Sequence, residues 1–132
     1  MGSSGTTEFG CEACYGEDPI AASNYYRQCP TDELVEDDPH FILRIKHCER
    51  CEQRFVSIFT EFVDWSGGED AMYTTVMPVT EAEAAAISAA ALSYRQIGEL
   101  GRGRKHLRSD WPTGKPKRIG WHHSSFQVMP GF

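Results

Sequence analysis

The sequence lacks an apolar stretch long enough to cross a bilayer, for which about 20 consecutive apolar residues are needed. Residues 1–7 contain neither a basic group nor an apolar segment, so they do not resemble a secretory signal peptide. We therefore expect a cytoplasmic protein. The chain of 132 residues has a hydrophobic fraction of 40%, which is enough for one globular domain with its own core.

Catalytic sequence motifs are also missing. The chain contains no glycine-rich phosphate loop, no nucleophile elbow and no His-Glu-x-x-His motif. His122 and His123 are adjacent, and adjacent side chains on an extended chain point to opposite sides, so they do not converge on one metal ion. We expect no enzymatic activity.

Cysteine is sparse but grouped. Four of the five cysteines form two Cys-x-x-Cys pairs, Cys11 with Cys14 and Cys48 with Cys51. In a reducing compartment such pairs favour a metal over disulfides, and four thiolates complete the tetrahedral coordination of one structural zinc ion. A redox or disulfide role is the alternative. Cys29 stands alone, and we expect it to be a small buried residue.

Residues 11–79 resemble a zinc ribbon, since two Cys-x-x-Cys pairs are combined with strand-like segments. The resemblance implies that Cys11, Cys14, Cys48 and Cys51 bind zinc on two knuckles, the short turns that each present two thiolates. Two features differ from the usual pattern. The spacer between the pairs has 33 residues, and Glu52 follows the last cysteine where a small turn residue is common. His47, beside Cys48, lacks the paired spacing of a ligand.

The middle of the chain has β-strand patterns. Residues 41–46 alternate between two faces, which is the period of a half-buried strand. Residues 54–65 and 71–79 are rich in β-branched and aromatic residues and are separated by the turn sequence Ser66-Gly67-Gly68. The sequence therefore predicts three antiparallel strands.

A capping box marks the start of a helix, with Thr80 as N-cap and Glu83 three residues later. Residues 82–100 are rich in alanine and other helix formers, and Gly101 ends the pattern. On one helix of this length Ile87, Ala90, Tyr94 and Ile97 share a face, which we expect to lie against the sheet.

The predicted fold class is α+β: a zinc ribbon with a three-stranded antiparallel sheet, followed by one long helix and an irregular C-terminal tail. The predicted divisions are a disordered N-terminus at residues 1–10, a zinc-ribbon β domain at 11–79, a capped helix packed on the sheet at 80–101, and a basic tail rich in Gly, Pro and aromatic residues at 102–132.

Charge is divided unevenly along the chain. Residues 1–83 contain 17 acidic and 5 basic side chains, whereas residues 84–132 contain 2 acidic and 8 basic ones, so net charges of −12 and +6 make up the total of −6. This asymmetry predicts two surfaces of opposite sign, or a basic tail that folds back on the acidic body.

Two kinds of partner follow from these charges. We favour a protein partner, with the chain as an adaptor, regulator or immunity-type inhibitor that presents an acidic surface to a basic one. The residues expected to form that surface are Asp32, Glu33, Glu36, Asp37 and Asp38. The alternative is a zinc ribbon that binds nucleic acid through the basic tail. Its candidate residues are Arg102, Arg104, Lys105, Arg108, Lys115, Lys117, Arg118 and Trp121.

Overall fold

The computed structural model describes residues 6–7 and 9–131. Its strands are β1 (Thr6–Thr7), β2 (Gly10–Cys11), β3 (Thr31–Asp38), β4 (Phe41–His47), β5 (Arg54–Phe62), β6 (Ala71–Val79), β7 (His106–Trp111) and β8 (Arg118–His122). Its helices are α1 (Glu12–Tyr15), α2 (Pro19–Gln28), α3 (Glu81–Ser88), α4 (Tyr94–Leu100) and the short 3₁₀ helix η1 (Gly101–Gly103).

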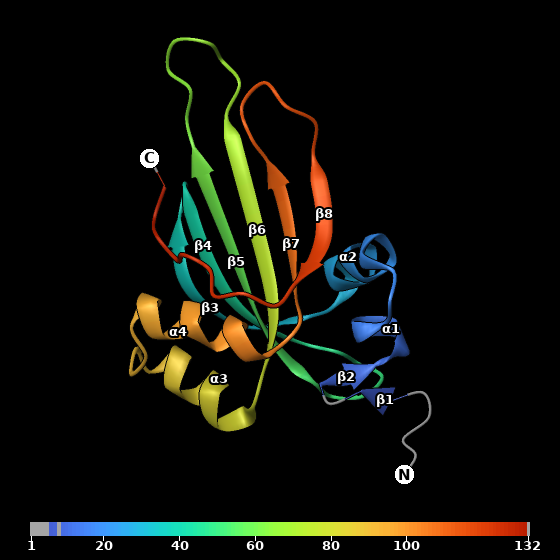
Figure 1. Ribbon diagram of the computed structural model, residues 1–132. Coiled ribbons are helices and arrows are strands. Elements are labelled where there is room, and N and C mark those ends of the chain that lie inside the picture. Colours follow the sequence, from blue (N-terminus) through green and yellow to red (C-terminus); the bar gives the residue numbers. More distant parts are fainter. Residues whose placement is uncertain (1–5, 8, 132) are drawn as a thin grey trace.

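One antiparallel sheet organises the molecule. Strands β3 to β8 follow one another in space in the same order as in the sequence, so each pairs with its neighbours along the chain. Helices α3 and α4 and the C-terminal segment lie in front of this sheet in Figure 1, and α1 and α2 lie beside its lower right part. The small pair β1–β2 lies next to α1.

The prediction of a three-stranded sheet is wrong, because the sheet has six strands. The acidic segment forms β3, which pairs with β4 across a turn at Pro39 and His40. An edge strand exposes one side to solvent, where charged side chains cost little. The segment predicted as an irregular tail contains β7 and β8, which pair with β6 and with each other. Strands β5 and β6 lie within the predicted ranges, and β4 extends one residue beyond the predicted range 41–46.

The prediction of one long helix is also wrong. Helix α3 ends in a turn where the Ala91 amide bonds to the Ala86 carbonyl, and Ala90 adopts a positive φ of 58°. Helix α4 then begins with a second capping box, formed by Ser93 and Gln96. Helix propensity favours continuation through this alanine-rich region, but the reversal brings Leu92 back toward the core.

Two apolar cores lie on opposite faces of the sheet. The helix-side core lies under α3 and α4, and its buried residues are Phe41, Leu43, Ile45, Val56, Ile58, Met77, Val79, Ala84, Ile87, Ile97 and Val128. The knuckle-side core lies under α1 and α2, and its buried residues are Cys14, Tyr15, Ala22, Tyr26, Cys48, Phe55, Val76 and Leu107. Alternation along the strands separates the two sets, so that Val56 and Phe55 belong to different cores.

The prediction of a disordered N-terminus at residues 1–10 can be compared with the structure only in part. Residues 1–5 and 8, which were expected to be disordered, lie outside the described residues. Within the same range, Thr7 pairs with Gly10 in the β1–β2 ladder. No helix among the described residues is long and apolar enough to cross a membrane.

Candidate metal centre

Two connections of the chain bring the four paired cysteines together. Cys11 ends β2 and is the N-cap of α1, which places Cys14 one helical turn later. Cys48 and Cys51 lie in the connection between β4 and β5, where the Glu52 amide bonds to the Cys48 carbonyl at 2.8 Å. The N-terminal pair is thus held against one end of the sheet.

The sulfur atoms form a compact cluster. All four Sγ atoms lie within 4.8 Å of one another. The Sγ–Sγ distance is 3.8 Å for Cys11–Cys14, 3.8 Å for Cys11–Cys48 and 3.7 Å for Cys14–Cys51. A regular tetrahedron of sulfurs at the usual zinc–sulfur distance of about 2.3 Å has edges of about 3.8 Å. In residues 6–7 and 9–131 this is the single group of three or more potential ligands that lie so close together.

Hydrogen bonds to sulfur favour ionisation at one knuckle. Burial opposes ionisation of the Cys48 thiol, but the Tyr25 hydroxyl and the amides of Cys51 and Arg50 outweigh it and lower its pKa to about 7. The Tyr25 Oη–Cys48 Sγ distance is 3.2 Å. At Cys14 burial dominates and raises the pKa of the thiol. A cation among the sulfurs would favour both thiolates.

Backbone conformation explains how the knuckles form despite the departures noted in the sequence. Glu52 adopts a positive φ of 68°, the left-handed conformation in which glycine is common. The knuckle therefore forms without a small residue there. Gly10 has a φ of 112°, and a Cβ atom at this position would lie 2.7 Å from the Cys14 sulfur. Gly10 was not predicted as part of the site, although its place directly before Cys11 was a usable signal.

Tyrosines attach the cysteine segment to the rest of the fold. The Tyr26 hydroxyl donates to the Cys14 carbonyl, and the Tyr15 hydroxyl donates to the Lys105 carbonyl at 2.5 Å. The Lys105 ammonium in turn donates to the Tyr15 carbonyl at 3.1 Å. The sequence analysis did not assign Tyr25 or Tyr26 to the site, because their proximity to the cysteines depends on how α2 packs against the sheet.

Neither Cys29 nor His47 belongs to the cluster. Cys29 is buried, and its thiol lies 3.5 Å from the Tyr25 carbonyl. His47 Nδ1 lies 2.7 Å from a carboxylate oxygen of Asp32, so its side chain is engaged at the edge of the sheet.

The five predicted acidic residues all lie on β3 and are exposed. Three of them have contacts within the protein. Asp32 contacts His47 and also Arg54, at 3.4 Å. Asp38 accepts a hydrogen bond from the His40 amide at 2.9 Å. Glu36 hydrogen-bonds the Tyr94 hydroxyl and, after burial, contributes to raising its pKa.

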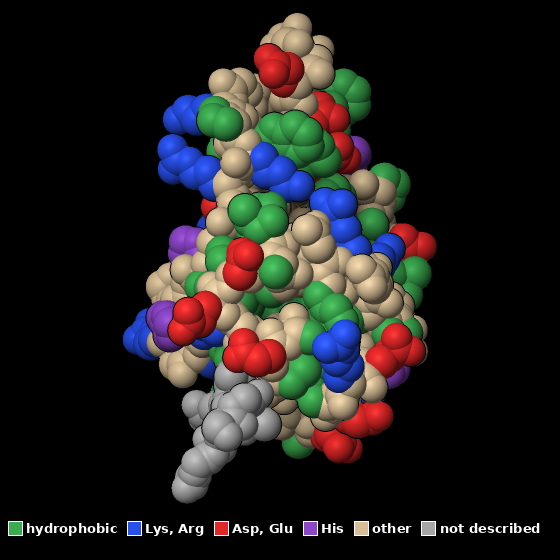
Figure 2. All heavy atoms as spheres, turned by 90° about the vertical axis from the view of Figure 1, so that its right-hand side faces the viewer, with side chains coloured by type: hydrophobic (Ala, Val, Ile, Leu, Met, Phe, Trp, Pro, Cys, Tyr) green, Lys and Arg blue, Asp and Glu red, His purple; other side chains and the backbone are tan. Residues whose placement is uncertain are grey.

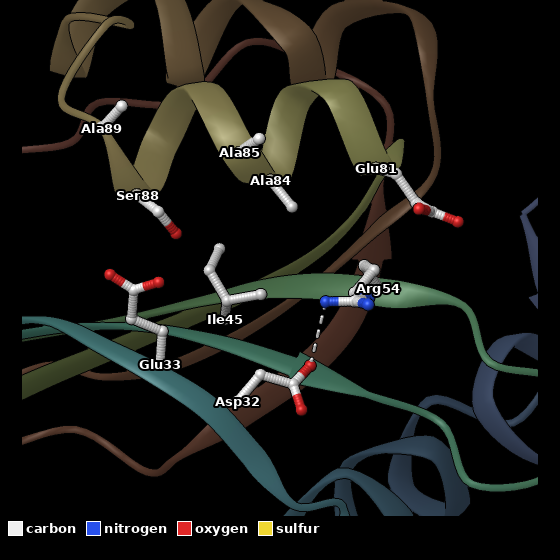
Figure 3. A pocket seen from close by; sticks show the side chains of 9 residues that line it. All are labelled: Asp32, Glu33, Ile45, Arg54, Glu81, Ala84, Ala85, Ser88 and Ala89. Atoms are coloured by element: carbon white, nitrogen blue, oxygen red, sulfur yellow. Dashed lines mark hydrogen bonds and ion pairs between the residues drawn. The ribbon is translucent and has the colours of Figure 1, made fainter.

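A groove of about 680 Å³ runs between β3 and α3 (Figure 3). Asp32, Glu33 and Glu81 give it an acidic lining, with Arg54 as the one basic residue. Figure 3 shows small side chains of α3 on the opposite wall, above Ile45. Two of the predicted acidic residues therefore border a surface depression.

Four of the tail cations predicted to bind nucleic acid make contacts within the protein. The Arg104 guanidinium bonds to both carboxylate oxygens of Glu83, at 2.8 and 3.2 Å. Arg108 lies 3.6 Å from Asp110, and Arg102 lies 3.1 Å from Glu99. The fourth is Lys105, described above.

The other predicted tail residues lie on the β7–β8 hairpin. Lys115, Lys117 and Arg118 are exposed. Trp121 donates through its indole N–H to the Glu17 carbonyl at 3.0 Å and packs edge-on against Tyr15 at 5.5 Å between ring centroids. The predicted tail residues therefore fall into two groups, one that contacts the rest of the protein and one that is exposed.

No protein-family model matches the chain, and comparisons with curated proteins and with solved structures return no match.

Proposed function

We propose that the four clustered cysteines are a structural zinc site. The observation that carries this proposal is the set of Sγ–Sγ distances of 3.7–3.8 Å, which correspond to the edges of a zinc–thiolate tetrahedron. Zinc suits a site with sulfur ligands alone, and its binding free energy adds to the stability of a small core.

A site of this kind supports a binding function over a catalytic one. Four protein thiolates complete the coordination of zinc, so no position remains for an activated water molecule. We therefore propose that the protein is not an enzyme and works as a binding module, with zinc holding α1 and α2 against the sheet.

The proposed partner is a protein with a basic surface, and the proposed contact is the acidic edge formed by β3. An edge strand offers unpaired backbone groups as well as side chains. The adjoining groove adds Glu81 to the acidic set and offers small side chains of α3 against which a partner can pack closely. Opposite charges on the two surfaces would accelerate their encounter, as in an immunity-type inhibitor.

Metal analysis tests the first proposal. The purified protein should contain one zinc ion per chain, and cobalt substitution should produce the absorption of a tetrahedral thiolate complex. Cys14→Ser should lose both signals, whereas Cys29→Ser should keep them, because Cys29 lies outside the cluster. A metal content unaffected by Cys14→Ser would contradict the site.

A second experiment tests the acidic edge. The zinc-loaded protein is used to capture its partner from nuclease-treated extract, and association is then measured at low salt. The triple variant Glu33→Gln, Glu36→Gln, Asp37→Asn should associate at least about tenfold more slowly, because steering by opposite charges is lost. The matched control is Glu17→Gln, Glu49→Gln, Glu69→Gln, which removes three exposed charges elsewhere. Equal rates for the two variants would exclude the acidic edge.

A further inference from the structure

Part of the knuckle-side face of the sheet is not covered by any helix of the described residues. Helix α2 covers the part where Phe55, Val76 and Leu107 are buried. Beyond it, a cross-strand row of side chains crosses β4, β5, β6 and β7 and remains partly accessible. This row is Ile42, Phe59, Thr74 and Ser109. We call this uncovered region the open face.

Two adjoining hollows occupy the open face. One has a volume of about 360 Å³ and the other about 140 Å³, and both are bordered by Arg27, Ser57 and Thr74. Four cationic side chains line them, namely Arg27, Arg44, Lys46 and Lys117, and no acidic side chain does. In a protein with a net charge of −6, such a local excess of positive charge needs an explanation.

The two arginines of the open face have no ionic or hydrogen-bonding partner within the part of the chain that the structure describes. Among residues 6–7 and 9–131, neither Arg27 nor Arg44 takes part in an ion pair, and neither guanidinium makes a hydrogen bond. Lys46 donates to the Tyr26 carbonyl at 2.7 Å. An anion bound here would offset the repulsion between these clustered positive charges.

Aromatic and hydroxyl groups accompany the cations. Phe59 lines the larger hollow, and Ser57 and Thr74 offer hydroxyl donors. Trp111 is exposed and pairs with Met72, two register positions beyond the Thr74–Ser109 pair, and the Lys117 ammonium lies 5.6 Å from the centroid of its ring. Figure 2 shows several Lys and Arg side chains beside hydrophobic ones in the upper half of the side that it presents, together with Asp and Glu side chains at the top and upper right and further ones lower down.

The acidic groups nearest in register lie outside the hollows. Asp37 pairs with Ile42 at the β3 edge, and Glu61 pairs with Met72 beyond the row. Glu61 contacts His40 at 3.2 Å, which partly neutralises it when the imidazole is protonated. The hollows themselves therefore keep their positive charge.

We propose that the open face binds single-stranded nucleic acid. Cations and hydroxyl groups would contact the phosphates, while Phe59 and Trp111 would stack on unpaired bases. A shallow surface cannot enclose most of a small ligand, which small-molecule sites usually do, but it can contact a polymer that passes across it. An acidic polypeptide would use the cations and leave the stacking surface unused.

This inference goes beyond the proposed function and uses a different surface from the acidic edge. It also differs from the tail hypothesis of the sequence analysis, with which it shares Lys117 alone. Arg27, Arg44 and Lys46 come from α2 and β4, far from the tail in sequence, and packing of α2 against the sheet brings them together.

The test is fluorescence anisotropy with the zinc-loaded full chain and a labelled oligothymidylate of about 12 nucleotides, a length that spans one binding surface. Binding should saturate, and the logarithm of affinity should fall with the logarithm of salt with a slope of about −3, as four phosphate contacts predict. The double variant Arg27→Gln, Arg44→Gln should reduce the slope to about −1.5 and weaken binding about 50-fold at about 50 mM salt.

The matched control is Arg95→Gln, Arg102→Gln, which removes two exposed positive charges on α4 and η1. It should bind like the unmodified protein. Trp111→Ala should weaken binding about tenfold through lost stacking. Circular dichroism and zinc content should be unchanged in all three variants, so that a failure here is separate from a failure of the zinc proposal.

Three results would overturn the inference. The first is no saturable binding of the oligonucleotide by protein that contains one zinc per chain. The second is an equal loss of affinity in the control variant. The third is competition by polyglutamate as strong as competition by unlabelled oligothymidylate, which would assign the surface to acidic polypeptides instead.

Discussion

The two faces of the sheet are stabilised in different ways. The helix-side core consists of apolar side chains, and its fully buried members include Phe41, Leu43 and Ile87. The knuckle-side core includes two of the clustered cysteines, Cys14 and Cys48, and several tyrosines. Apolar burial stabilises the first face, whereas on the second face the proposed zinc ion would bind thiols packed at 3.7–3.8 Å and add its binding free energy.

The comparison shows how a short chain covers both faces of one sheet. Helices α3 and α4 present a nearly continuous apolar surface to the helix side. On the knuckle side, α1 and α2 have four and ten residues, about as many in total as the eight and seven of α3 and α4, but they bury only Cys14, Tyr15, Ala22 and Tyr26. The clustered sulfur atoms take the place of apolar contacts at one end of that face, and another part of it stays open.

Loss of the proposed zinc ion should produce the largest effect, and on one face first. Cys48→Ser, or chelation of the metal, should lower the free energy of unfolding by about 5 kcal/mol or more, since structural zinc contributes most of the stability of such sites. Hydrogen exchange should show residues 11–28 losing protection while β4, β5 and β6 keep theirs. Cys29→Ser is the control and should keep both metal and protection. Equal loss of protection in all strands would show that the two faces unfold together.

Truncation in the helix-side core should give the next largest effect. Ile87 is 2% exposed, so Ile87→Ala should cost about 2–5 kcal/mol of unfolding free energy through lost burial and a cavity. Zinc content should not change, because Ile87 belongs to the other core. Denaturant unfolding measures the cost. Ile20→Ala, at a residue 58% exposed, is the matched control and should cost less than about 0.5 kcal/mol.

Removal of the hydroxyl that contacts sulfur should have a smaller effect, confined to the knuckle side. Tyr25→Phe deletes the donor that lies 3.2 Å from the Cys48 sulfur. Metal affinity should fall about tenfold, as is usual when a group that hydrogen-bonds a ligand is removed. Competition with a chromophoric chelator measures this affinity. Tyr94→Phe, in the helix-side core, should leave the metal affinity unchanged. An equal loss of metal affinity in Tyr94→Phe would show that the loss comes from altered packing.

Acidification should have the smallest effect on stability, and this effect should arise at the start of α3. Burial opposes ionisation of Glu83, but bonds from Arg104 and the Thr80 amide outweigh it and lower the pKa of its carboxyl below the ordinary 4.5. A lowered pKa in the folded state means that this stabilisation is present above pH 4.5 and is lost as the pH falls through the folded value. Glu83→Gln should therefore flatten the acid limb of a plot of stability against pH. An unchanged loss of stability at acid pH would show that other carboxyl groups determine it.

The three central strands were predictable because each has a periodic or β-rich pattern of its own. Strand β3 was not predictable, since its eight residues include five acidic ones and only Val35 is partly buried. Its pairing with β4 decides its conformation. Strands β7 and β8 were not predicted for a related reason, because the glycines and prolines around them hide the pattern of a short strand. These strands form because β6 provides a partner for pairing.

The break between α3 and α4 did have a local signal. Ser93 and Gln96 form the same capping pattern as Thr80 and Glu83, and the sequence analysis used the first pattern but overlooked the second. Alanine-rich sequence favours a continuous helix, yet the tertiary fold requires Leu92 and Ile97 to contact one core.

The sequence by itself determined the two cysteine pairs and the central strands, whereas the meeting of the two pairs depends on tertiary packing. Cys-x-x-Cys spacing brings two thiolates together within one turn, and alternation over a few residues defines a strand, so both are local properties. Only the tertiary structure decided the edge strand β3, the open face and the place of Tyr25. These features depend on side chains far apart in the sequence, such as Arg27 and Lys117, which meet because the sheet and α2 pack together.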